Sequence, residues 1–280
     1  MIHKMTRSLL AAVLAAAWLG CIAIPAGAAV IATEYFNGYG ATDLTMEAIP
    51  DGGGFGWTSE WGAANIGTDD NEYRAGANLT ISKPGYDNSE NLSGTTHGAV
   101  GFDANNAGPS TSARTLNTTA TTVWFSALVS RGNATSHALL WIDTTHGGDG
   151  NDFIGLLSGE YEMRYNNVTT TNNVLVTANT TYLVLGKAEI DVSGNNDRLS
   201  FWFDPDLTGG EAGLGSPTAS AEDADTFGTS IDGIGVMMTN EGLLDAIRVG
   251  TTYADVIPEP SSVCLLAAGL LGLIGLRRRK

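Results

Sequence analysis

The stretch TTVWFSALVS, residues 121–130, decides the fold class of this 280-residue chain. Its odd-numbered residues from 123 to 129 are apolar, and Trp124 and Leu128 would lie on the opposite face of an extended strand. A period of two is typical of a β-strand, because successive side chains of a strand point to opposite faces. We therefore expect a strand here that gives at least one face to a hydrophobic core.

Short runs of β-branched and aromatic residues follow along the chain, separated by clusters of Gly, Asn, Asp and Thr. They are HALLWIDT (137–144), DFIGLL (152–157), EYEMRYN (160–166), TTYLVLGKAEIDV (180–192), RLSFWFD (198–204) and DGIGVMM (232–238). The runs contain no proline, and helical periodicity is almost absent. This spacing predicts an all-β fold, a two-sheet antiparallel sandwich of jelly-roll type.

The body of the chain, 29–256, is expected to be one domain. It shows no internal repeat, and its length suits a single sandwich with a substantial core. The Gly, Asn and Thr-rich stretch 88–112 and the acidic stretch 204–225 are interpreted as long loops within that domain.

The C-terminal stretch VIPEPSSVCLLAAGLLGLIGLRRRK, residues 256–280, has a different character. As a helix, its apolar run 263–276 would be about 21 Å long, short of a hydrocarbon core of roughly 30 Å. The run has no polar face, and the cations that follow it fit the positive-inside pattern of a membrane stop sequence. We therefore expect a short membrane helix with a basic tail.

The order Pro258-Glu259-Pro260, apolar helix and arginine cluster (277–279) closely resembles the PEP-CTERM sorting signal of Gram-negative bacteria. The resemblance covers 257–280. It implies that an exosortase-type protease recognises the signal, that the inner-membrane anchor is transient, and that the protein reaches the cell surface or an extracellular matrix. Sorting and processing are thus assigned to Pro258, Glu259, Pro260, Arg277, Arg278 and Arg279.

The first 28 residues are typical of a secretory signal peptide. Two cations precede an apolar stretch, and Ala26 and Ala28 form an A-x-A site for signal peptidase. The alternative is lipoprotein processing at Cys21, although Trp18 is unusual where a small aliphatic residue is common. An exported form starting at residue 29 follows from the first interpretation.

Removal of both ends leaves a strongly acidic domain without cysteine. Between 29 and 257 there are eight Lys and Arg residues against twenty-nine Asp and Glu residues, which gives a net charge of −21. Such a surface repels phosphate backbones and anionic lipid, so nucleic acid is excluded as a partner. Both cysteines, Cys21 and Cys264, lie in the predicted terminal signals.

A second resemblance extends over most of the body. GGGFGWTSEWG (52–62), ARTLNTTATTVWFSALVSRG (113–132), FWFDPDL (201–207) and LLDAIRVGTTYADVIPEP (243–260) occur in this order. They are similar to the concanavalin A-like (LamG-like) sandwich of many PEP-CTERM proteins. The resemblance implies a jelly roll with a closing strand near 244–249, and it implies no activity.

The sharpest catalytic candidate is EIDVSG, 189–194, because retaining glucanases of this fold carry their carboxylates on one strand. Alternation would place Glu189 and Asp191 on one face, but the next acidic residue, Asp197, follows a predicted turn. The alternative source of the missing carboxylate is another strand, for example Glu160 or Glu162. With the pattern broken, we expect no catalytic residues and no enzyme; the alternative is an atypical or degenerate glycan-active hydrolase.

Two loops carry binding candidates. Trp57 and Trp61 could stack on sugar rings of an extracellular polysaccharide, or cap the core of the sandwich. Asp149, Asn151 and Asp152 offer the oxygen ligands that calcium prefers, or they form an ordinary polar turn. No other cofactor is expected. The sequence thus predicts an exported structural, adhesive or glycan-binding module.

Overall fold

The computed structural model describes most of the exported domain. The described residues are 30–37, 39, 44–45, 54–59, 61–63, 72–88, 98–101, 110–116, 118, 120–142, 152–166, 168–224 and 226–257. They belong to one compact unit, 29–259. The predicted signal peptide, the PEP segment, the apolar run and the basic tail lie outside the described residues.

One sheet has nine strands. In order across the sheet they are β14 (Ala219–Ala224), β13 (Asn196–Phe203), β12 (Tyr182–Ser193), β7 (Thr122–Arg131), β16 (Gly242–Gly250), β5 (Gly98–Gly101), β4 (Glu72–Ala75) and β2 (Leu44–Thr45), and β1 (Val30–Glu34) also pairs with β16. The pairings in this sheet are antiparallel. The stretch 121–130 thus forms a central strand, β7, between β12 and β16.

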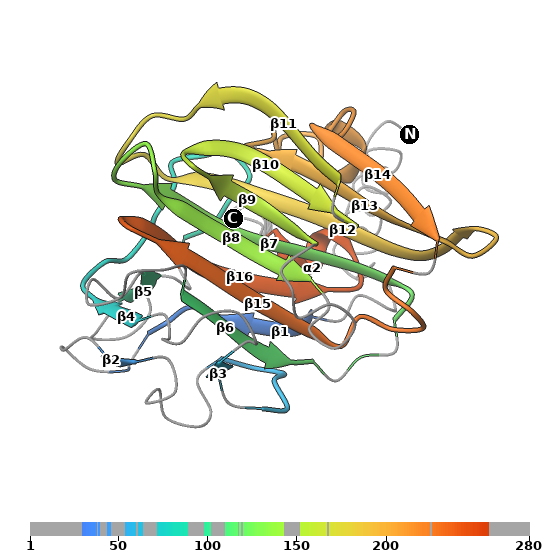
Figure 1. Ribbon diagram of the computed structural model, residues 1–280, viewed down its shortest axis with the longest axis horizontal. Helices are drawn as coiled ribbons and strands as arrows, with labels where there is room; N and C mark the ends of the chain where they lie inside the picture. Colours follow the sequence, from blue (N-terminus) through green and yellow to red (C-terminus); the bar gives the residue numbers. More distant parts are fainter. Residues whose placement is uncertain are drawn as a thin grey trace, which may run out of the picture. The chain divides into compact units, whose positions relative to one another are not determined.

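The second sheet has seven strands. In order they are β11 (Val168–Leu175), β10 (Glu160–Tyr165), β9 (Phe153–Leu157), β8 (His137–Ile142), β15 (Gly233–Thr239), β6 (Ser110–Thr115) and β3 (Gly62–Ala63), all antiparallel to their neighbours. In Figure 1 the strands β8, β9 and β10 of this sheet overlie β7 and β12 of the first. The prediction of an all-β, two-sheet antiparallel jelly roll is confirmed.

The main core fills the space between the sheets. Val123 and Phe125 of β7 meet Leu140 of β8 and Ile154 of β9, and all four side chains are buried. Burial of such residues is the main favourable term in folding, about 1.5–3 kcal/mol for each large apolar side chain. The core fixes which residues of each strand face inward, and therefore which face outward.

The outer face of the nine-stranded sheet is covered by other parts of the chain. Trp124 and Leu128 of β7 pack there with the segment 79–86, with Leu207, and with the short helix α2 (Tyr253–Val256). β7 is therefore buried on both faces along Val123–Arg131. The continuous burial explains why the opposite face of TTVWFSALVS also carries large apolar residues, Trp124 and Leu128, beside its serines.

Two stretches interpreted as loops contain strands. The stretch 88–112 includes β5 and the first residues of β6, and 204–225 includes β14 and a 3₁₀ turn, Glu211–Gly213. β5 reads GAVG, with Val100 as its one β-branched residue, and β14 reads ASAEDA, with none, so both are poor in the residues that mark strands in a sequence. Their pairing with longer neighbours, and not their local propensity, makes them strands.

Candidate functional site

An apolar cluster lies on the outer face of the seven-stranded sheet, the face turned away from the nine-stranded sheet. Leu139, Trp141 and Phe153 are buried there, and Leu157 and Met237 pack against them. In an antiparallel sheet one face is often solvated and polar. This outer face is therefore partly apolar, unlike the solvated face of an ordinary antiparallel sheet.

Strand β10 brings two carboxyls and a cation to this cluster. Met163 and Tyr165 of the strand enter the main core, so Glu160, Glu162 and Arg164 point to the outer face. In the strand register, Glu162 lies opposite Gly155 and Arg164 opposite Phe153 of β9. The buried ring of Phe153 therefore lies next to the row of charged side chains on β10.

The surroundings of Glu162 favour the protonated form of its carboxyl group. Its side chain is only 4% exposed. Burial raises its pKa to about 7, and neighbouring Glu160 adds to the rise, while a hydrogen bond from Thr169 and the charge of Arg164 oppose it. Near neutral pH such a carboxyl is present in both protonation states, which is what general acid catalysis needs.

Two ring nitrogens at this face make no hydrogen bond to the described residues. Trp141 Nε1 and His137 Nδ1 are buried, and no described residue hydrogen-bonds to either. His137 Nε2 lies 3.3 Å from Ser158 Oγ, and burial lowers the pKa of the imidazole. A buried donor without a partner costs free energy, so it favours a ligand that can accept the hydrogen bond.

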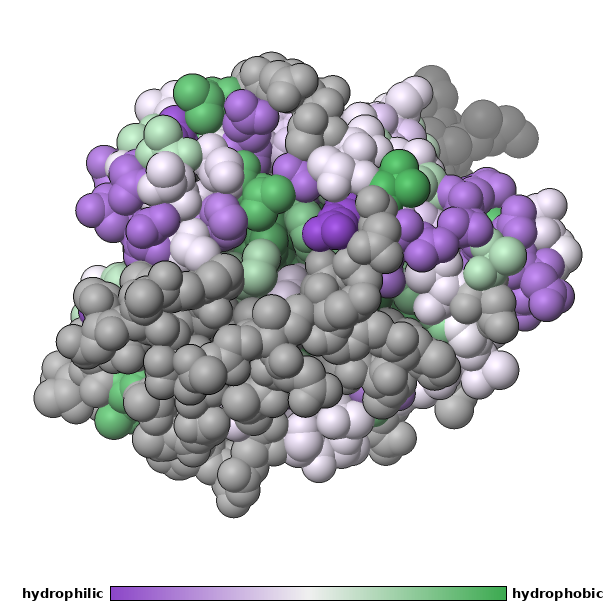
Figure 2. Space-filling view, in the orientation of Figure 1, coloured by the Kyte–Doolittle hydropathy of each residue, from purple (hydrophilic) through white to green (hydrophobic). Residues whose placement is uncertain are grey.

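Figure 2 shows apolar surface in a hollow at the position of β9 and β10 in Figure 1, with strongly hydrophilic surface beside it. The glycines in this sheet help to shape the face. A Cβ at Gly235 would lie 3.0 Å from Cε3 of Trp141, so the indole rests on the glycine backbone. Apolar rings beside polar groups are the usual lining of small-molecule and sugar sites.

The carboxylates of EIDVSG do not form the expected pair. Glu189 lies on the outer face of the other sheet, 2.8 Å from Lys187 Nζ and 3.6 Å from Arg198. Asp191 has a φ of 55°, which breaks the alternation of the strand. Asp197 is buried, where it accepts the N–H groups of Asp191 and Phe227. This segment therefore serves as a hairpin end.

Trp57 and Trp61 surround a buried ion pair between the two sheets. Arg114 of β6 lies 2.9 Å from Glu34 of β1, and its guanidinium lies 5.2 Å from the Trp57 ring and 5.6 Å from the Trp61 ring. Tyr39 also donates to Glu34, at 3.0 Å. Trp61 is 2% exposed and Trp57 half-buried. Sugar stacking by this pair stays a prediction.

The ion pair yields a stability prediction. Arg114→Ala should lower the free energy of unfolding by about 3–5 kcal/mol, because it leaves the Glu34 carboxylate buried without its cation. Urea denaturation of residues 29–257 measures the change. Arg198→Ala is the matched control: its partners Glu189 and Glu222 are more exposed, so its loss should have little effect. Equal effects of the two variants would contradict the assignment.

Part of the calcium candidate can be placed. Asp149 and Asn151 lie outside the described residues, whereas Asp152 is described and accepts the backbone N–H of Asn166 at 2.7 Å. The Asn166 side chain in turn donates to Asp223. Within the described ranges, no group of three or more His, Cys, Asp or Glu side chains is placed to hold a metal ion. Calcium binding stays a prediction.

The terminal processing residues have no described position. Ala26, Ala28, the PEP segment and Arg277–Arg279 fall outside the described ranges. Among the helices that the structure does describe, none has the length and apolar character needed to cross a membrane.

Several solved structures resemble the domain at low identity. An endo-β-1,4-glucuronan lyase from the fungus Trichoderma reesei is 16% identical, with 78% of this chain and 98% of that chain covered and a TM-score of 0.42. A putative β-glucanase from Mycobacterium abscessus is 15% identical, with 79% and 100% covered and a TM-score of 0.42. The Bacillus licheniformis β-glucanase is 11% identical, with 81% and 98% covered and a TM-score of 0.37. No curated protein matches the chain.

The expectation that this protein is not an enzyme is wrong. The resembling structures include lyases and glycoside hydrolases as well as a carbohydrate-binding module, all at 16% identity or less. The expectation rested mainly on the broken pattern of EIDVSG. The structure places a different pair of carboxyls, Glu160 and Glu162, on the outer face of the other sheet.

A family model described as the PEP-CTERM protein-sorting motif matches residues 256–280. The match confirms the resemblance drawn from Pro258-Glu259-Pro260, the apolar run and the arginine cluster. PEP-CTERM signals mark exported proteins that are sorted to the cell envelope. The chain therefore carries a PEP-CTERM sorting motif, preceded by a jelly-roll domain.

Proposed function

We propose that the exported domain is a glycan-active hydrolase that cleaves a neutral polysaccharide on the outer face of its seven-stranded sheet. The observation that carries the proposal is Glu162, a buried carboxyl with a pKa of about 7 beside a second carboxyl and an apolar cluster. Glu162 protonates the glycosidic oxygen as the bond to the leaving sugar breaks. The electron pair of that bond goes to the protonated leaving group.

Glu160 is the second carboxylate of the reaction. It lies two residues from Glu162 on the same face of β10, a distance of about 6.7 Å along the strand. Carboxyl groups about 5–5.5 Å apart favour attack by the carboxylate itself, and groups about 6.5–9.5 Å apart favour attack by a water that the carboxylate deprotonates. Rotation of the Glu160 and Glu162 side chains allows either distance between the two carboxyl groups. Glu160 therefore acts as nucleophile or as base.

The charge of the domain selects the substrate class. With a net charge of −21 between residues 29 and 257, the surface repels polyanions such as uronate or sulfate polymers. Near the site, the charge of Arg164 acts on Glu162. A neutral glycan avoids this repulsion, and its C–H faces fit Leu157 and Met237, the partly exposed members of the apolar cluster.

The proposed route of export follows the two terminal signals. Signal peptidase cuts after Ala28, and the PEP-CTERM tail holds the protein briefly in the inner membrane of a Gram-negative cell. An exosortase-type protease then releases the domain to the cell surface or its polysaccharide matrix. The hydrolase would thus act where the glycan is assembled or remodelled.

Assays of the purified unit, residues 29–257, test the proposal. We expect new reducing ends from laminarin or agarose, which are neutral, and none from alginate or carrageenan, which are acidic. The rate should fall above about pH 7, tenfold per pH unit at the limit, because Glu162 must carry a proton to act as the acid. No turnover on any neutral glycan of this set or of the host matrix, or a rate that rises steadily to pH 9, would contradict it.

A further inference from the structure

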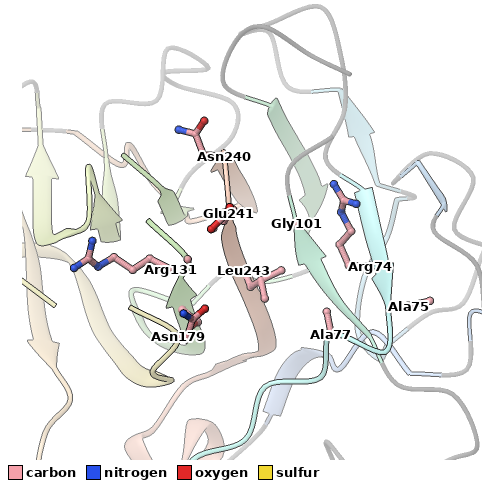
Figure 3. A pocket seen from close by; sticks show the side chains of 12 residues that line it. Arg74, Ala75, Ala77, Gly101, Arg131, Asn179, Asn240, Glu241 and Leu243 are labelled. Carbon is pink, nitrogen blue, oxygen red and sulfur yellow. The ribbon is translucent and has the colours of Figure 1, made fainter. Parts of the chain in front are cut away.

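A second cavity lies at one end of the sandwich, away from the Glu162 face. Its volume is about 470 Å³, within the range of small-molecule sites. It is bounded by β4, β5, the end of β7 and the turn between β15 and β16 (Figure 3). None of its lining residues belongs to the outer face that carries Glu162.

The walls of this cavity differ in chemistry. Figure 3 shows Arg74 on the β4 side and Glu241 with Asn240 on the side of the β15–β16 turn, with Leu243 between them. Asn179 closes the lower side in this view. The cavity therefore offers charged and amide groups around an aliphatic patch.

Glycines keep the cavity open. A Cβ at Gly132 would lie 2.0 Å from Glu241 Oε2, and a Cβ at Gly101 would lie 2.7 Å from Arg74 Cγ. The Glu241 and Arg74 side chains thus lie across bare backbone. Any larger residue at these two positions would displace a wall.

The backbone around the cavity is held by hydrogen bonds. The Asn179 N–H donates to the carbonyl of Arg131 at 2.7 Å, and the Gly132 N–H donates to the carbonyl of Glu241 at 2.9 Å. Arg131 itself is only 8% exposed, and its Nε donates to Val176 O at 2.7 Å. Arg131 therefore supports the wall, and the Asn179 and Glu241 side chains remain as groups for a ligand.

A neighbouring cavity of about 490 Å³ shares Asn179 with the first. Hydroxyl side chains predominate in its lining, with Thr80, Ser82 and Tyr182 among them, and its one lysine is paired with an aspartate, Lys83 with Asp204 at 2.9 Å. Together the two cavities give a polar path longer than one small molecule.

We propose that the two cavities that share Asn179 in their linings form a second glycan-binding site, for consecutive units of a neutral saccharide chain. Each sugar hydroxyl is both a donor and an acceptor, and this lining offers amides, hydroxyls and carboxylates for both roles. Leu243 meets the C–H face of a sugar, and the net charge of −21 between residues 29 and 257 disfavours an anionic ligand. The site is a binding site, and it does not depend on cleavage at Glu162.

Binding of hexasaccharides from laminarin and from agarose tests the site. Calorimetry would use residues 29–257 carrying Glu162→Gln, so that cleavage does not consume the probe. We expect Asn179→Gly, which removes a hydrogen-bonding side chain, and Glu241→Gln, which replaces a charged acceptor by a weaker neutral one, each to raise Kd roughly three- to tenfold. Glycine is chosen at 179 because the residue has a φ of 55°.

Two controls match these variants. Glu211→Gln changes an exposed glutamate elsewhere, and Asp191→Gly changes an exposed residue whose φ is also 55°. Both should leave Kd unchanged. No binding of either hexasaccharide, or equal weakening in variants and controls, would overturn the second site. Turnover by the unsubstituted protein is measured separately, so a failed hydrolase proposal would show as binding without cleavage.

Discussion

Replacement of Glu162 by glutamine is expected to lower kcat on a neutral polysaccharide by about 100- to 10,000-fold, the usual contribution of a general acid. The amide keeps the size of the side chain but has no proton to give to the glycosidic oxygen. Glu189→Gln is the matched control. Glu189 is ion-paired with Lys187 on the outer face of the other sheet, so its replacement should leave kcat unchanged.

Loss of activity in Glu162→Gln should not come from unfolding. The folded state raises the pKa of this carboxyl to about 7, so it holds the proton more tightly than the unfolded chain does. Stability from this group is therefore full below about pH 4.5 and lost as pH rises through 7. A neutral glutamine avoids that loss, and at pH 8 the variant should be at least as stable. Equal activity in Glu162→Gln and the unsubstituted domain would refute the assignment.

The fold could be predicted from the sequence because its long strands carry clear alternation. β7, β12 and β13 match the runs 121–130, 180–192 and 198–204 closely. The order of strands in the sheets could not be predicted in this way. β16, near the chain end, lies beside β7 in the middle of the nine-stranded sheet, and this depends on long-range pairing that no local pattern encodes.

The site was harder to predict than the fold. EYEMRY shows Glu160, Glu162 and Arg164 on one face, and a polar face normally indicates solvent. The signal that could have found the site is in neighbouring strands. HALLWI and DFIGLL are apolar on both faces, with Trp141 and Phe153 on the face that alternation assigns to water. These observations can be connected only when the strands adjacent to β10 are known.

The carboxylate pair expected in EIDVSG does not form because of the backbone conformation of this segment. The alternation that would pair Glu189 with Asp191 requires a regular strand through both residues. The pairing of β12 with β13 shifts register after Glu189, and Asp191 has a positive φ. A bulge of this kind turns side chains away from their expected face, and an Asp in that conformation gives only a weak sequence signal.

The last residues of the domain should be indispensable for its stability. Tyr253, Val256 and Ile257 are 6%, 0% and 1% exposed, and Tyr253 packs edge-on against Trp124 with ring centroids 5.8 Å apart. The Val256 carbonyl accepts a 2.7 Å hydrogen bond from Ser126 Oγ. At about 1.5–3 kcal/mol for each buried apolar side chain, removing 253–257 costs roughly 5–9 kcal/mol. That is comparable to the whole stability of a domain, about 5–15 kcal/mol.

Residues 29–252 are therefore expected to be largely unfolded at 25 °C, whereas residues 29–257 show a cooperative urea transition. The PEP segment begins at Pro258, directly after Ile257, which is buried and is the last residue that the structure describes. A sorting protease that cut before Ile257 would release an unstable domain, so the exported form should retain Ile257. Intact-mass analysis of surface material tests this point, and a C-terminus before Tyr253 on a folded, protease-resistant protein would contradict it.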